Sequence, residues 1–509
     1  MKLSDIPALL KNELSPRWVC NEPSTKRLRG IQYDSRHVSP GDLFVAIPGS
    51  ETDGHFFLEQ AKLAGAGAVL VEKEPNKSLG IPTLLVTNSR LALAQLAAPF
   101  FGFPTRELDL IGITGTNGKT TTSILTETIL REANRKVGLI GTLGTRYENE
   151  KLKNINTTPE SLEIQRTLRR MKNRDVDSVV MEVSSHGLAL GRVTGCDFQV
   201  AAISNLSQDH LDFHGDMKNY SEAKKLLFTR YLCKGGIAVI NITELNTLDF
   251  VEAVTQKDAS TIKISKSKKS EADVFCKQYT CGPDNTEMEV FTPAGSFEVS
   301  VPLIGAFNVE NSLLAIGIAF ALDIPNAIIK QGLAKCPQVP GRLERIESKD
   351  YQPRVFVDYA HTPDALKKLL STLRPLSTGR LIVVFGCGGD RDRSKRPIMG
   401  RVVAENADIA LLTSDNPRNE DPEIILRDVE TGLQASKCYE RSELLSRQTG
   451  YTKVSNRKDA ISAAVSLANS KDIVVIAGKG HEDYQIIGSK RFPFDDREEA
   501  RQALKQRAL

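Results

Sequence analysis

The stretch Gly112-Ile-Thr-Gly-Thr-Asn-Gly-Lys-Thr-Thr-Thr122 is the part of the sequence around which the rest is organised. The apolar residues 108–113 indicate a buried strand, and residues 123–130 place apolar side chains at helical spacing. A strand, a glycine-bearing loop and a helix together turn backbone N–H groups and a helix N-terminus towards phosphate. We therefore expect Lys119 to reach the terminal phosphates of a nucleotide and Thr120 to bind Mg²⁺.

The match to the general phosphate-loop pattern is imperfect. Ile113 stands where a glycine is expected, and Gly112 and Gly115 flank that position instead. An ordinary glycine-rich turn before a helix is the alternative interpretation. The placing of Gly-Lys-Thr-Thr between a strand and a helix favours nucleotide binding.

Length and composition restrict the class of protein. A chain of 509 residues is too long for one hydrophobic core, and about three domains are expected. The formal net charge of +4 is nearly balanced, which argues against a nucleic-acid surface. Eight scattered cysteines without a Cys-x-x-Cys pair are typical of reduced thiols in a cytoplasmic protein. There is no signal-peptide core and no apolar run of membrane length, so we expect no membrane insertion.

The order of apolar segments predicts a three-domain α/β fold, with domains at residues 1–106, 107–337 and 338–509. The third domain shows four predicted strands, each of which ends in a polar loop bearing glycine or proline. Strands that alternate with helical segments indicate a parallel sheet, whose functional groups belong at the carboxyl ends of the strands.

Two further segments suggest a metal site near the phosphate loop. Glu182 ends the predicted strand 178–183, where nucleoside-triphosphate enzymes hold Mg²⁺. Residues 208–215 contain two histidines and two aspartates, and this oxygen-rich segment fits Mg²⁺ and phosphate better than zinc, with His210 as a metal partner. An exposed charge at Glu182 and local turn hydrogen bonds in 208–215 are the alternatives.

Helical spacing gives two more candidates. Lys224 and Lys225 are adjacent in the predicted helix 220–228, so one should point inward and the other towards solvent. Asn308 and Asn311 lie three residues apart on one helical face, from which they could bond a nucleotide base.

Five motifs taken together resemble the Mur ligases of peptidoglycan synthesis. The motifs occur in the family's order over essentially the whole chain, and they are Gly115-Thr-Asn-Gly-Lys-Thr-Thr121, Met181-Glu-Val-Ser-Ser-His186, Asp209-His-Leu-Asp-Phe-His-Gly215, Asp358-Tyr-Ala-His361 and Ala477-Gly-Lys-Gly-His-Glu482. The resemblance implies an N-terminal domain that binds a UDP-linked substrate, a central P-loop-type ATPase domain with a parallel sheet, and a Rossmann-like C-terminal domain that binds an amino acid. Asp415-Asn-Pro-Arg418 resembles the branch that adds meso-2,6-diaminopimelate to UDP-N-acetylmuramoyl-L-alanyl-D-glutamate.

The chemistry implied by the resemblance is an ATP-dependent amide ligation. ATP phosphorylates the D-glutamyl side-chain carboxylate to an acyl phosphate, and an amine then displaces phosphate to give an amide. Lys119 and Mg²⁺ would offset the repulsion between the two anions. By resemblance Lys224 is carbamylated, and its carbamate would bind Mg²⁺ with Thr120, Glu182 and His210. Lys225 is the rival for that role.

The resemblance also assigns residues to each substrate. ATP would be bound by Gly115, Thr116, Asn117, Gly118, Lys119, Thr120, Thr121, Asn308, Asn311, Arg342 and His361. The UDP-linked substrate would be bound by Ser35, Asn156, Thr157, Thr158, Ser184 and Arg192. The chain departs from some relatives at Leu190, where they carry glutamine, which puts one substrate hydrogen bond in doubt.

The amino acid is expected on the third domain. Its site would comprise Arg391, Asp415, Asn416, Pro417, Arg418, Gly478 and Glu482. The guanidinium of Arg418 suits the distal carboxylate of diaminopimelate, which lysine lacks, and the acidic groups would pair with an ammonium. A surface arginine after a turn is the alternative for Arg418.

The alternative functions are an L-lysine-adding ligase of the same type, a folylpolyglutamate synthase, a nucleotide-binding scaffold without turnover, and a P-loop phosphotransferase acting on a hydroxyl. We expect a cytoplasmic monomer with small-molecule substrates and no nucleic-acid partner. Domain closure is also expected, because water would hydrolyse an acyl phosphate.

Overall fold

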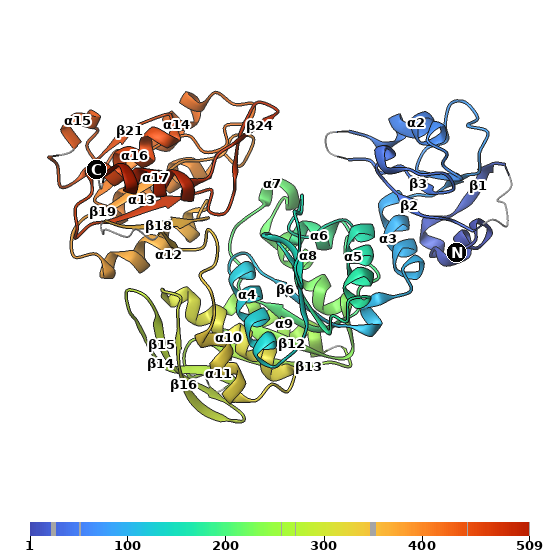
Figure 1. Cartoon of the computed structure of the whole chain (residues 1–509), viewed down its shortest axis with the longest axis horizontal. Coiled ribbons are helices and arrows are strands. Elements are labelled where there is room, and N and C mark those ends of the chain that lie inside the picture. The colour runs from blue at the N-terminus through green and yellow to red at the C-terminus, as the bar shows by residue number, and fades with distance from the viewer. Residues whose placement is uncertain are drawn as a thin grey trace.

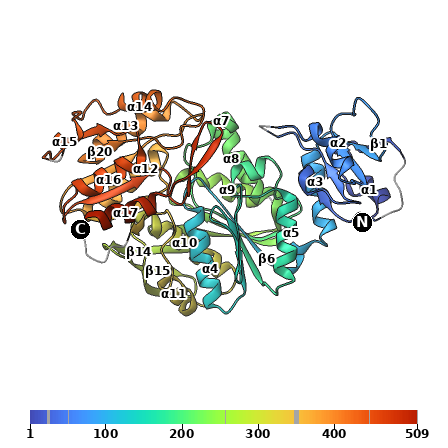
Figure 2. The same ribbon diagram turned by 45° about the horizontal axis from the view of Figure 1, so that its top comes forward.

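The computed structural model describes residues 1–21, 27–49, 52–255, 257–269, 271–346, 353–444 and 446–507. The chain forms three lobes, each built on its own β-sheet. The N-terminal lobe lies at one end of the molecule, and the C-terminal lobe lies against the other side of the middle lobe (Figures 1 and 2). The predicted three-lobed α/β fold is confirmed, whereas the predicted domain boundaries stay a prediction.

The N-terminal lobe has a five-stranded sheet in the order β1-β5-β4-β3-β2. All neighbours are parallel except β1 and β5. The central strands are buried along their whole length because helices and loops cover both faces of the sheet. Its main elements are β1 (Arg17–Cys20), β2 (Ile31–Gln32), β3 (Leu43–Val45), α2 (Leu58–Leu63), β4 (Ala68–Val71), β5 (Thr83–Leu85) and α3 (Ser89–Phe100).

The middle lobe has an eleven-stranded sheet in the order β16-β15-β14-β13-β12-β11-β6-β10-β7-β8-β9. The six central pairings, from β14 through β6 to β7 in this spatial order, are parallel. The antiparallel strands β15 and β16 extend one edge, and β8 and β9 extend the other. The strands are β6 (Asp109–Thr114), β7 (Val137–Gly141), β8 (Gly144–Tyr147), β9 (Glu150–Leu152), β10 (Ser178–Glu182), β11 (Phe198–Ile203), β12 (Leu232–Asn241), β13 (Ser260–Ser265), β14 (Val274–Cys281), β15 (Thr286–Thr292) and β16 (Gly295–Val301).

Two hydrophobic cores cover the two faces of this sheet. Successive side chains of β6 point to opposite faces, so Leu110 belongs to one core and Ile111 to the other. The helices around the sheet are α4 (Lys119–Glu132), α5 (Ser161–Lys172), α6 (Ser185–Ala189), α7 (Leu211–His214), α8 (Met217–Leu226), α9 (Leu248–Thr255), α10 (Ala306–Ala321) and α11 (Asn326–Ala334).

The C-terminal lobe has a six-stranded sheet in the order β17-β18-β22-β19-β20-β21, parallel except for β17. The four strands expected from sequence, β18, β22, β19 and β20, are adjacent, so their carboxyl ends share one edge. The elements are β17 (Glu344–Ile346), β18 (Arg354–Asp358), α12 (Pro363–Leu373), β19 (Leu381–Phe385), α13 (Lys395–Asn406), β20 (Ile409–Leu412), α14 (Pro422–Glu430), α15 (Arg441–Leu444), β21 (Gly450–Lys453), α16 (Arg457–Leu467), β22 (Ile473–Ala477), β23 (Tyr484–Ile487), β24 (Lys490–Pro493) and α17 (Asp496–Arg507).

Within the described ranges, no helix combines the length and the apolar character needed to cross a lipid bilayer.

Candidate active site

The loop between β6 and α4 has the backbone shape that its glycines permit. Gly115 and Gly118 have φ of +137° and +86°. A Cβ on Gly118 would lie 2.2 Å from the Asn311 side chain, and one on Gly115 would lie 2.0 Å from Ser204 Oγ. Glycine is therefore required at both positions, and the predicted strand–loop–helix arrangement is confirmed.

Lys119 begins α4 and lies over this loop. Its Nζ donates to the carbonyl oxygens of Gly115 and Thr116 at 2.8 and 2.9 Å. Burial lowers the pKa of Lys119, while the nearby carboxylates of Glu182 and Asp209 oppose that shift. The segment just after β11 holds the loop residues Thr116 and Asn117, since Thr116 N donates to Asn205 O and Asn117 N to Asn205 Oδ1.

Glu182 is completely buried at the end of β10, so the alternative of an exposed strand-end charge is wrong. Its carboxylate accepts from Thr120 Oγ1, from Thr142 N and from Thr142 Oγ1, each at 2.9 Å. The strand order explains this convergence, because β10 lies between β6 and β7. Sequence reasoning missed Thr142, for which the available signal was its position just after the apolar strand Val137–Gly141.

Lys224 is the inward-pointing lysine of the pair in α8. It is 1% exposed, its Nζ donates to Gly115 O at 2.9 Å, and it lies 4.5 Å from the centre of the Tyr220 ring. Lys225 instead pairs with Glu222 at 2.9 Å, and its side chain is 16% exposed. Burial, reinforced by the charge of Lys119, lowers the pKa of Lys224 well below its ordinary value.

His210 lies beside these groups in a left-handed backbone conformation, with φ of 55°. Its ring packs edge-on to His186, with ring centres 4.7 Å apart, and its Nε2 is 3.4 Å from Asp209. Burial lowers the pKa of His210 to about 4, with His186 and Lys119 acting in the same direction and Asp209 against it. The imidazole is therefore neutral near pH ~7, the form in which a ring nitrogen binds a metal. His186 belongs to the motif at residues 181–186, but the sequence did not predict a role for it.

A metal would have to be held by an unusual donor set here. No group of three or more His, Cys, Asp or Glu side chains in the described part of the chain is arranged to hold one. The predicted set contains two residues of those types, Glu182 and His210, besides Thr120 and Lys224. The buried carboxylate of Glu182 next to the Thr120 hydroxyl is nevertheless the oxygen-rich surrounding that Mg²⁺ prefers.

Residues predicted for the nucleotide come together from two lobes. Asn311 Nδ2 donates to Asn308 Oδ1 at 2.9 Å within α10, next to Gly118. Arg342, just before β17, stacks on the Tyr359 ring at 4.4 Å, and its Nη2 lies 3.5 Å from Thr120 Oγ1. The C-terminal lobe thus places a guanidinium at the phosphate loop.

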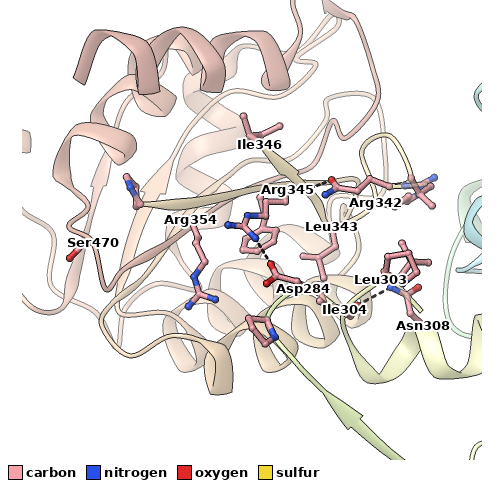
Figure 3. Close-up of a pocket in the computed structure, with 16 residues that line it drawn as sticks. Asp284, Leu303, Ile304, Asn308, Arg342, Leu343, Arg345, Ile346, Arg354 and Ser470 are labelled. Carbon is pink, nitrogen blue, oxygen red and sulfur yellow. Dashed lines mark hydrogen bonds and ion pairs between the residues drawn. The ribbon is translucent and has the colours of Figure 1, made fainter. Parts of the chain in front are cut away.

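A cavity of about 720 Å³ opens between the middle and C-terminal lobes. Asn308, Arg342 and Leu343 are among its lining residues, and Arg345 pairs with Asp284 across it (Figure 3). The volume suits a small ligand. His361, also predicted for the nucleotide, does not line this cavity.

His361 lines a second cleft of about 520 Å³ between the same two lobes. Six of the seven residues predicted for the amino acid line it as well, together with His210 and Asp209 from the middle lobe; the six are Arg391, Asp415, Asn416, Arg418, Gly478 and Glu482. Pro417 does not line the cleft and packs its backbone against Gly389. Tyr359, Lys395 and Tyr484 also line the cleft and were missed. Each lies next to or at the end of a strand or helix, where the direction of the side chain does not follow from the sequence.

Arg418 is held with its side chain in the cleft, which contradicts the alternative of a free surface arginine. It is half-buried, has φ of 52°, and donates from Nη1 to Gly389 O at 2.7 Å. Burial lowers the pKa of Arg418, and the charge of Arg391 acts in the same direction. The carboxylates of Asp415, Glu482 and Asp390 oppose this shift, so the cleft holds both guanidinium and carboxylate groups.

Four of the residues predicted for the UDP-linked substrate form one group beside Glu182. Thr158 Oγ1 lies 3.2 Å from Ser184 Oγ, Arg192 Nη1 donates to Thr158 O at 3.1 Å, and Thr157 Oγ1 lies 3.1 Å from Thr142 Oγ1. Asn156, by contrast, is exposed.

The N-terminal lobe meets this group through an ion pair that the sequence did not suggest. Glu160 binds Arg192 at 3.0 Å and also pairs with Arg90 of α3. Ser35 lies in the N-terminal lobe, where it donates to Gln60 at 2.9 Å. The contacts among described residues do not join Ser35 to the group around Thr158.

Comparisons with known proteins agree over the whole chain. Three family models match, described as "Mur ligase family, catalytic domain" at residues 27–101, "Mur ligase middle domain" at 113–319 and "Mur ligase, glutamate ligase domain" at 341–480. A curated relative from Bacillus licheniformis, named UDP-N-acetylmuramoyl-L-alanyl-D-glutamate--2,6-diaminopimelate ligase, is 42% identical over 504 residues, which are 99% of each chain. A relative of the same name from Geobacillus thermodenitrificans is 44% identical over 94% of this chain and 95% of its own. A solved structure described by that name has 32% identity and a TM-score of 0.68, covering 100% of this chain and 99% of that one.

Proposed function

Because this chain belongs to the Mur ligase family, we propose that it joins 2,6-diaminopimelate to UDP-N-acetylmuramoyl-L-alanyl-D-glutamate in an ATP-dependent, amide-forming reaction. The observation that carries the proposal is the 42% identity over 99% of both chains to a relative with that name. The geometry supports it. The phosphate loop, the cluster of Thr157, Thr158, Ser184 and Arg192 beside Glu182, and the second cleft meet where the middle and C-terminal lobes face each other.

The phosphate loop and the cavity beside it serve ATP in this proposal. Lys119 leaves the carbonyl oxygens that it contacts and binds the terminal phosphates, while the loop N–H groups and the start of α4 bind the others. Asn308 and Arg342 line the adjacent cavity, which we assign to the base and ribose. Arg342 can serve both regions because its guanidinium lies 3.5 Å from Thr120 Oγ1.

Thr120, Glu182, His210 and Lys224 are the residues that we propose for Mg²⁺. When bound, the ion would neutralise charge on the phosphate and carboxylate oxygens that must approach each other. The hydroxyl of Thr120 and the amide and hydroxyl of Thr142 keep the Glu182 carboxylate oriented in a buried site.

We propose that the Mg²⁺ set includes a carbamate on Lys224. A carbamate forms when a neutral amine attacks CO₂, making an N–C bond and releasing a proton. Lys224 suits that reaction because it is buried and shares the Gly115 carbonyl with Lys119, so that two ammonium groups would repel each other there. The modification would replace the second cation by an anion.

The acyl donor and the amine approach from opposite sides. Thr158, Ser184 and Arg192 are proposed to hold the muramoyl dipeptide next to the phosphate loop. Arg391 and Arg418 bind the distal carboxylate of diaminopimelate, and Asp415 and Glu482 accept from its ammonium. The other amine then faces the middle lobe, from which His210 lines the same cleft.

The alternatives differ in what they require of the cleft. An L-lysine-adding ligase would not need a second carboxylate site, whereas Arg391 and Arg418 lie together here. A scaffold or a phosphotransferase acting on a hydroxyl would need no such site for an amino acid. We propose a monomer in the cytoplasm, where ATP is supplied.

The test is an omission experiment with the full-length chain. Purified protein with Mg²⁺, bicarbonate, ATP, the UDP-linked dipeptide and meso-diaminopimelate should release phosphate and yield a product heavier by one diaminopimelate minus water. Omitting any one reactant should abolish the product. Phosphate release with folate, or equal use of L-lysine, would contradict the assignment.

A further inference from the structure

Lys479 lies behind the second cleft, which we assign to the amino acid, and does not line it. Its side chain is completely buried, and its Nζ donates to Glu482 Oε2 at 3.0 Å and to Asn416 Oδ1 at 3.2 Å. Both acceptors belong to side chains that line the cleft, whereas Lys479 does not. A completely buried ammonium cannot touch a substrate in the cleft, so any influence on binding must pass through these two neighbours.

The surrounding contacts hold both neighbours in one orientation. Asn416 Nδ2 donates to the same Glu482 oxygen at 2.9 Å, and Ile486 N donates to Asn416 Oδ1 at 2.9 Å. Glu482 Oε2 therefore receives two donors, and Asn416 Oδ1 also receives two. Glu482 Oε1 accepts no hydrogen bond from the described residues. One oxygen of Glu482 is anchored and the other is left for a ligand.

We propose that Lys479 is a positioning residue for the amino-acid substrate: it anchors Glu482 and Asn416 from below, so that Glu482 Oε1 accepts from the substrate's ammonium. The inference rests on the proposed function, because the ligand is the amino acid of that reaction. A side chain that supports a binding group from behind fixes its geometry without contacting the ligand.

The first test compares steady-state kinetics of Lys479→Met with those of the unaltered protein. The KM for diaminopimelate should rise about tenfold or more, while the KM values for ATP and the UDP-linked dipeptide change less than about twofold. Arg380→Met is the matched control, since Arg380 is a largely buried cation of the same lobe that pairs with Asp472 and lines neither cleft. Its KM for diaminopimelate should not change. An equal rise of all three KM values in Lys479→Met would indicate a general structural role and overturn the proposal.

The second test is a double-mutant cycle with Glu482→Gln. Because Lys479 acts mainly through Glu482, adding Lys479→Met to Glu482→Gln should raise the KM for diaminopimelate less than it does in the unaltered background. An equal or larger rise would overturn the proposal. Removing one member of a buried ion pair can prevent folding, and Lys479→Met is such a variant. If it does not fold, the KM for diaminopimelate of the double variant, which lacks both charges, is compared with that of Glu482→Gln. Similar KM values support the proposal, and a clear further rise in the double variant overturns it. If the unaltered protein makes no product, the proposed function fails; if it does and Lys479→Met keeps its KM, only this inference fails.

Discussion

Lys119 and Lys224 donate to the same carbonyl oxygen, that of Gly115, at 2.8 and 2.9 Å. Two ammonium groups on one acceptor in a buried site repel each other, and both pKa values are lowered, first by burial. The charge of Lys119 at the phosphate loop therefore acts on Lys224 of helix α8. The protonation state of Lys224 can be measured through its effect on stability.

The stability of the protein should depend on pH through Lys224. Its pKa is lower in the folded state than the ordinary value of 10.5, so between these two values the unfolded chain binds more protons. Stability therefore rises with pH across that window. In Lys224→Met the slope of unfolding free energy against pH should be smaller by up to ~1.4 kcal/mol per pH unit. Urea unfolding of both proteins in CO₂-free buffer at several pH values measures this slope. Equal slopes for Lys224→Met and the unaltered protein would contradict the prediction.

Replacing Glu182 should strongly reduce turnover without unfolding the middle lobe. Glu182→Gln keeps the shape and accepts from Thr120, but it removes the buried negative charge that we assign to Mg²⁺. We expect kcat to fall by about 10²–10³, as for the loss of one preorganised electrostatic group in an active site. Phosphate release over a range of Mg²⁺ concentrations checks this. Full activity at ordinary Mg²⁺ would remove Glu182 from the metal site.

Arg342 should couple the C-terminal lobe to ATP. Its guanidinium lies between the Tyr359 ring and Thr120, so Arg342→Ala should raise the KM for ATP by about tenfold or more, corresponding to at least ~1.4 kcal/mol. Arg345→Ala is the comparison variant, because Arg345 lines the same cavity and its side chain pairs with Asp284. Among the described residues its hydrogen bonds are to Gln338 and Asp284 and none is to the phosphate loop. If both variants change the KM for ATP equally, the guanidinium at Thr120 has no special role.

Arg418 should determine the use of diaminopimelate. Arg418→Ala should cost ~2–4 kcal/mol in kcat/KM for diaminopimelate and leave the KM for ATP almost unchanged. Arg418→Lys should recover only part of the loss, since an ammonium lacks the planar pair of donors. The exposed Arg393, which pairs with Glu420, serves as the control as Arg393→Ala. Equal loss towards all three substrates would refute the assignment of Arg418.

Local sequence was sufficient for the phosphate loop and for the strands that lead into functional loops. The steric needs of Gly115 and Gly118 and the apolar runs of β18, β19, β20 and β22 are properties of short segments. Contacts between distant segments were not accessible in this way. Thr142, the Glu160–Arg192 pair and Lys479 were missed because each has a partner that is distant in the sequence.

The sequence by itself determined the three-lobed α/β fold, the phosphate loop and the family, because these follow from backbone sterics, apolar periodicity and motif order within short stretches. Only the tertiary structure decided that Lys224 and not Lys225 points inward, that Thr142 donates to the Glu182 carboxylate, and that Arg342 reaches Thr120. The physical reason is that side chains converge according to strand order and lobe packing. Those depend on the burial of all the apolar surfaces together, and no single segment contains that information.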